Sequence, residues 1–98
     1  MNQNKIARLR RELERLRSTS VNALVIQRLA KKLGRKRVKR GKEPTWESEA
    51  FPNLRPLAIP DHGGKDLSPG VKNSVLNQLE DDLLAWDERI NGEASTRD

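Results

Sequence analysis

The sequence predicts an α+β fold in which two helices cover one face of a small antiparallel sheet. Three observations support this prediction. Apolar residues recur at helical spacing in the first third and in the last third of the chain, and short alternating runs separated by turn residues occupy the middle. The 98 residues, of which 34% are hydrophobic, leave room for one modest core. An additional basic helix is expected before this fold.

The first 17 residues have the pattern of an amphipathic helix with arginine on its polar faces. Its apolar stripe, at spacings of three and four, consists of Ile6, Leu9, Leu13 and Leu16. The stripe is shorter than a lasting coiled coil requires, so we expect this helix to dock on another element or to fray. We assign residues 1–19 to this basic arm. Ser18, Thr19 and Ser20 are candidate caps for the helix that follows.

A second helix is predicted over residues 21–33, with Gly34 as its stop. The side chains expected to face inward are Val21, Leu24, Val25, Leu29 and Leu33. The basic residues Arg28, Lys31 and Lys32 lie toward its C-terminal end, where the helix dipole favours cations.

Three short strands are predicted in the middle of the chain. Residues 35–42 are almost wholly basic, so a strand there would be exposed. The run 45–51 alternates in polarity and places Trp46 on a buried face. A Pro-Asn turn separates it from a third strand at 54–59, which Pro56 places near an edge because proline cannot donate to the ladder.

The last helix is predicted to start where Ser68 is followed by Pro69, a cap and first-turn pair. Its apolar stripe consists of Val71, Val75, Leu76, Leu79, Leu83, Trp86 and Ile90. We expect the helix to end before Gly92 and residues 92–98 to be a disordered tail.

Charge divides the chain into two opposite parts. Residues 1–42 contain fifteen Lys and Arg against Glu12 and Glu14, a net charge of +13. Residues 43–98 contain five basic against twelve acidic residues, a net charge of −7. Dense positive charge attracts phosphate and releases condensed counterions, so nucleic acid is the expected partner class.

Composition argues against several other classes. The chain has no cysteine, which excludes disulfides and thiolate chemistry, and one histidine does not make a zinc site. No stretch has the length and apolar character of a membrane span, and no signal peptide is recognisable. We therefore expect a cytoplasmic protein without a metal or small-molecule cofactor.

The run 59–70, IPDHGGKDLSPG, resembles the end of the HicA domain, where a strand ending in Ile-Pro-x-His leads through a polar loop into the last helix. The order of elements upstream is similar as well, so the resemblance covers about residues 20–91. It implies a fold like that of double-stranded-RNA-binding domains, with the order helix, three strands, helix. It also implies a type II toxin that cleaves messenger RNA and is neutralised by a HicB-like antitoxin protein.

Two residues are candidates for catalysis. HicA proteins usually carry a catalytic His after the Gly that ends the first strand, but here Gly41 is followed by Lys and Glu43. His62, the only histidine, could act as a general base or acid because imidazole titrates near neutrality, with Asp61 and Asp66 orienting it. The alternative is that His62 only shapes its loop. Glu43 is a weaker candidate, because basic neighbours would hold it ionised, and it could equally be a solvated turn residue.

The candidate RNA-binding residues are basic side chains of the second helix, the first strand and the loop before the last helix: Arg28, Lys31, Lys32, Arg35, Lys36, Arg37, Lys39, Arg40, Lys42 and Lys65. The alternative is a solubilising charge run. Trp46 could stack an unpaired base, but a core position facing Trp86 and Leu79 is the favoured interpretation. Three functions are therefore considered: a HicA-like ribonuclease, a non-catalytic RNA- or DNA-binding protein of the same fold, and a module whose basic arm binds an acidic protein.

Overall fold

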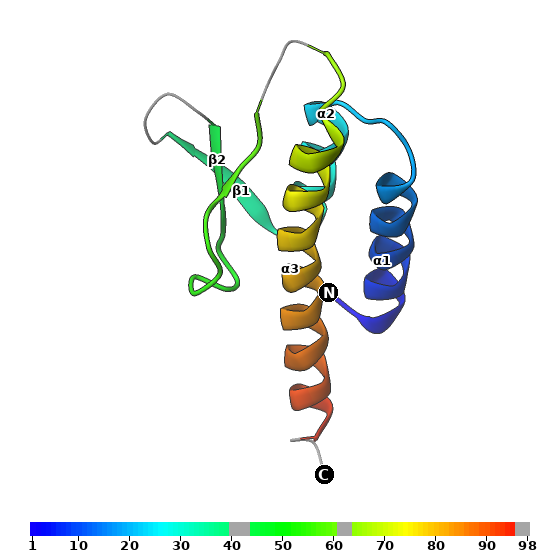
Figure 1. Ribbon diagram of the computed structural model, residues 1–98. Coiled ribbons are helices and arrows are strands. Elements are labelled where there is room, and N and C mark those ends of the chain that lie inside the picture. Colours follow the sequence, from blue (N-terminus) through cyan, green and yellow to red (C-terminus); the bar gives the residue numbers. More distant parts are fainter. Residues whose placement is uncertain (40–43, 61–63, 96–98) are drawn as a thin grey trace.

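The computed structural model describes residues 1–39, 44–60 and 64–95. It confirms the α+β class, with three helices and a three-stranded antiparallel sheet. The elements are α1 (Gln3–Arg17), α2 (Ala23–Lys32), β1 (Arg35–Lys39), β2 (Pro44–Ser48), β3 (Leu57–Ala58) and α3 (Pro69–Ser95). In Figure 1, α3 stands in the middle, with α1 on one side and the β1–β2 hairpin on the other, and α2 lies behind α3. Within the described part of the chain, no helix combines the length and apolar character that crossing a bilayer requires.

The sheet has the order β1-β2-β3, and both pairs are antiparallel. Its register places Arg35 opposite Ser48 and Trp46 opposite both Arg37 and Leu57. The buried side chains of Trp46, Ser48 and Leu57 therefore lie on the face that packs against the helices. The third strand has only two residues rather than the six expected, since Pro56 just before it has no N–H for the ladder.

Helix α1 belongs to the core of the protein. All four residues of its predicted stripe are buried in the same cluster as the apolar residues of α2, the sheet and α3: Ile6, Leu9, Leu13 and Leu16. At its start, the side-chain amide of Gln3 donates to Asp87 and Asn91 of α3, at 3.2 and 3.1 Å. Residues 1–19, expected as an arm, thus form a docked helix and its connection to α2.

Helix α2 begins two residues later than predicted, because Asn22 caps it by accepting the N–H of Val25 at 3.2 Å. The expected cap Ser18 instead closes the end of α1. The inward face consists of Ala23, Ile26, Leu29, Ala30 and Leu33, which follow helical spacing from residue 26 onward. The expectation for Leu24 was wrong, since its side chain is 51% exposed on the opposite side. Gly34 ends the helix with φ +95°, a conformation that favours glycine.

Helix α3 starts as predicted, with the Ser68 hydroxyl accepting the N–H of Val71 and Pro69 as first residue. The Val71 side chain itself is exposed, because the next residue, Lys72, takes the inward position of this first turn. The helix continues past Gly92 to Ser95, since one glycine lowers helix stability by only about 1 kcal/mol and does not stop the helix. Trp86 joins it to α2 by donating its indole N–H to the carbonyl of Leu33 at 2.8 Å.

Candidate nucleic-acid interface

The basic residues predicted on α2 are exposed, and two of them connect this helix to its neighbours. Arg28 lies one turn before Lys31 and Lys32 on the side opposite the buried stripe. The Lys31 ammonium lies 5.7 Å from the centre of the Trp46 ring, a cation–π contact with the sheet. The Lys32 ammonium pairs with Glu12 of α1 at 3.1 Å. Helix α2 therefore presents its cations between α1 and the sheet.

Strand β1 sends its basic side chains to both faces of the sheet. Arg37 is directly opposite Trp46, so both side chains leave the sheet on the face that also meets the helices. Lys31 lies over the same ring, so Arg37 and Lys31 both border Trp46. Lys39, two residues on, shares that face, whereas Lys36 points to the other face and reaches the exposed Glu49 at 3.5 Å.

Arg35 is inside the protein rather than on this surface. Its Nε and Nη2 each donate to a different carboxylate oxygen of Asp82 in α3 at 2.8 Å, and both side chains are 1% exposed. Its Nη1 donates to the carbonyls of Trp46 and Arg55, at 2.9 and 3.1 Å. Burial raises the pKa of the Asp82 carboxyl, against the lowering effect of Arg35. The guanidinium of Arg35 fixes β1 on α3, and its burial keeps it out of reach of a phosphate.

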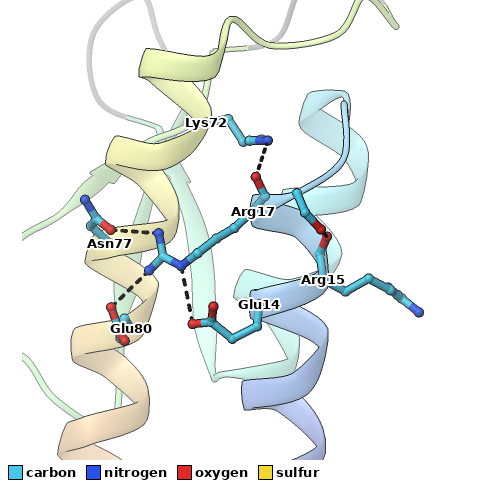
Figure 2. Close-up of polar contacts among 7 residues, drawn as sticks. Glu14, Arg15, Arg17, Lys72, Asn77 and Glu80 are labelled. Carbon is cyan, nitrogen blue, oxygen red and sulfur yellow. Dashed lines mark hydrogen bonds and ion pairs between the residues drawn. The ribbon is translucent and has the colours of Figure 1, made fainter.

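Sequence reasoning also missed the polar contacts that hold α1 on α3 (Figure 2). The ammonium of Lys72, on an almost fully buried side chain, donates to the carbonyls of Arg17 and Thr19 at 2.9 and 2.8 Å. Arg17 uses its guanidinium on Asn77 at 2.9 Å and on Glu80 at 3.0 Å. The signal for Lys72 was available, since it lies three and four residues before the apolar pair 75–76, in line with the buried stripe.

The remaining candidates do not join this surface. Arg40, Lys42, Glu43 and His62 lie outside the described residues. Lys65 is exposed in the loop before α3, next to the segment 66–67 that pairs with the start of α2. It is therefore at the opposite end of α2 from Lys31 and Lys32, about 15 Å away along the helix. Within the described ranges, no group of His, Cys, Asp and Glu side chains could hold a metal ion.

The aromatic side chains are used in packing. Trp46 is 2% exposed, which confirms its predicted core position. Its indole N–H has no hydrogen-bond partner among the described residues. Phe51 and Trp86 meet edge to face at 4.8 Å, and the Arg89 guanidinium covers the Phe51 ring at 4.1 Å. No row of open aromatic rings accompanies the basic side chains of α2 and β1 in the described part of the chain.

The arrangement of its own charges is the basis for assigning a function to this protein. No family model matches the chain, and no curated protein or solved structure is significantly similar to it. We define the α2–β1 surface as the exposed cations on the helix-facing side of the sheet and on the adjoining helix: Arg28, Lys31, Lys32, Arg37 and Lys39.

Proposed function

We propose that this protein binds RNA through the phosphates that contact the α2–β1 surface. The observation that carries the proposal is the isolation of its cations from carboxylates. Among the described residues, Arg28, Lys31, Arg37 and Lys39 have no ion-pair partner, and only Lys32 is engaged, by Glu12. Unpaired cations held side by side by a helix and a strand form a site that attracts a polyanion and releases its counterions.

The order of elements supports RNA with helical structure as the ligand. The series α2, β1, β2, β3, α3 corresponds to the helix, three strands, helix order of double-stranded-RNA-binding domains, and we propose that this arrangement applies to the present fold. Such domains contact phosphates and 2′-hydroxyls rather than base edges. Proteins that bind single strands commonly stack bases on exposed aromatic rings, and the packing of Trp46 and Phe51 provides no such platform.

The test compares two neighbouring residues that leave the strand on opposite faces. Arg37→Gln should weaken binding to unrelated RNAs about equally, because a phosphate contact carries little sequence information. It should also lower the slope of log K against log salt by about one unit. Lys36→Gln removes the same charge from the other face and should leave both quantities nearly unchanged. Equal effects of the two changes would contradict the α2–β1 surface as the binding site.

We also propose, as a second and more specific function, that the protein is a HicA-like toxin of a type II toxin–antitoxin system. The observation in its favour is the run 59–70, which resembles the HicA motif and places His62 before α3. In this proposal the substrate is messenger RNA, cleavage needs no metal, and a HicB-like protein neutralises the toxin. Expression of the protein alone should arrest growth, and purified protein should cleave messenger RNA. RNA binding without cleavage or growth arrest would instead identify a non-catalytic RNA- or DNA-binding protein.

A further inference from the structure

Helix α1 carries a second row of cations, separate from the α2–β1 surface. Arg8, Arg11 and Arg15 follow one another at spacings of three and four residues, so they form a single ridge on α1. The ridge lies on the side of the helix away from its buried stripe, and all three side chains are exposed. None of the three guanidinium groups has a hydrogen bond or an ion pair within the described residues.

Arg17 of the same helix differs from these three arginines because its side chain has a structural role. Its guanidinium contacts Glu14, Asn77 and Glu80, and together with Lys72 it holds the end of α1 on α3 (Figure 2). Arg8, Arg11 and Arg15 make no such contacts. Like charges at these spacings repel each other, and among the described residues no ion pair of Arg8, Arg11 or Arg15 offsets this repulsion.

The ridge is connected to the α2–β1 surface. A shallow hollow between the start of α1 and the end of α2 is lined by Lys5, Arg8, Glu12 and Lys32, among others. A second hollow continues along α1 past Arg8, Arg11, Glu12 and Arg15. The ion pair between Lys32 and Glu12 lies where these two hollows meet α2. A phosphate backbone that occupies the α2–β1 surface can therefore continue onto α1.

We propose that Arg8, Arg11 and Arg15 form a second RNA-backbone site, which we name the α1 ridge, and that one RNA occupies it together with the α2–β1 surface. This inference rests on the proposed RNA binding. From Arg8 to Arg15 the helix rises about 10 Å, so the three guanidinium groups can contact successive phosphates of one strand. The planar guanidinium forks match phosphate oxygens in bidentate geometry. The alternative ligand is an acidic protein, which the continuity with the α2–β1 surface does not favour.

The test uses the triple variant Arg8→Gln, Arg11→Gln and Arg15→Gln. The probe is an RNA duplex of about 25 base pairs, longer than the roughly 16 that a double-stranded-RNA-binding domain covers. Affinity is measured between about 0.05 and 0.2 M salt, and the slope of log K against log salt should fall by about 2 to 3 units. Arg11→Gln alone should lower it by about one unit. Thermal melting should show a midpoint close to that of the wild type, because exposed side chains without ion pairs contribute little to stability.

The matched control removes charge from the other side of the same helix. Arg10 lies on the line of Gln3 and Arg17, one heptad from each, and both of those residues contact α3. Arg10→Gln combined with Arg55→Gln, on the loop before β3, should leave the slope nearly unchanged.

Three other results would overturn the inference. A wild-type slope for the triple variant, with binding lost in the variant Arg28→Gln, Lys31→Gln, Arg37→Gln and Lys39→Gln, would remove the ridge and leave the proposed function in place. Failure of the wild-type protein to bind the duplex would reject both. Ridge-dependent binding of polyglutamate, with duplex binding unchanged by the triple variant, would assign the ridge to an acidic protein partner.

Discussion

Removing Asp82 should destabilise the protein far more than removing an exposed charge of the described chain. Its carboxylate accepts two hydrogen bonds of 2.8 Å from Arg35, and each side chain is 1% exposed. Asp82→Ala leaves an uncompensated guanidinium in the core, which costs about 3 to 5 kcal/mol. A domain of this size has a total stability of about 5 to 15 kcal/mol, so the variant should be close to unfolding.

Replacing both partners together should restore much of that loss. Arg35→Met with Asp82→Leu removes both charges and keeps similar side-chain volume, a change that is often neutral or stabilising in buried pairs. The carbonyls of Trp46 and Arg55 each lose one donor in this variant. Arg55 is exposed, so water can replace the donor there, and the one carbonyl left unsatisfied costs about 1 to 3 kcal/mol. The double variant should therefore unfold at a lower urea concentration than the wild type and at a higher one than Asp82→Ala.

The assay is urea unfolding followed by far-ultraviolet circular dichroism, at low salt and at about 0.5 M salt. The loss in Asp82→Ala should not depend on salt, because ions do not screen a pair that solvent cannot reach. Glu49→Ala is the control, since its pair with Lys36 is exposed and should contribute at most about 1 kcal/mol. If the free energy of unfolding of Asp82→Ala is within about 1 kcal/mol of the wild-type value, the pair does not hold β1 on α3 as described.

Three further changes test the core, the attachment of α1 and the chemistry. Leu79→Ala should lower the free energy of unfolding by roughly 2 to 5 kcal/mol in the same assay, because the side chain is fully buried. Unfolding at the same urea concentration as the wild type would contradict the packing of α3 described above. Lys72→Met removes two charge-assisted hydrogen bonds of 2.9 and 2.8 Å, and limited proteolysis should cut faster between α1 and α2; an unchanged cleavage rate would count against this attachment. If the protein is a ribonuclease, His62→Ala should lower cleavage by about a hundredfold while binding persists, and the rate should change near the pKa of a histidine. A mild effect of His62→Ala with a severe one of Glu43→Gln would move the catalytic role to the carboxylate.

Local sequence patterns were sufficient to predict the buried face of α1 and the start of α3. The stripe at Ile6, Leu9, Leu13 and Leu16 predicted the buried face of α1, and Ser68 with Pro69 predicted the first turn of α3. The inner face of α2 was predicted less well. Alanine counts little in a hydrophobic pattern, so Ala23 and Ala30 were passed over and Leu24 was placed inside instead.

The errors at the candidate site have a different cause. Arg35 looks like its basic neighbours in the sequence, and its partner Asp82 is 47 residues further along the chain. No local pattern connects the two, because the contact exists only once β1 and α3 pack together. The same holds for Lys72, whose acceptors at the end of α1 are more than 50 residues before it. Charge composition predicted a basic protein, but only the packing separates cations that face solvent from those that hold the fold.

The packing of α1 on α3 has a consequence for the order of folding during synthesis. Gln3 contacts residues 84 and 88 positions later. Among the described residues, every polar attachment of α1 to another helix except the pair of Glu12 and Lys32 is to α3. Contacts between such distant segments form late, after the loop between them has closed. While the ribosome is still translating α3, the basic first half of the chain has no acidic surface to pack against. Nascent chains should therefore stay protease-sensitive until α3 has left the exit tunnel, and ribosomal RNA is the nearest polyanion during that interval.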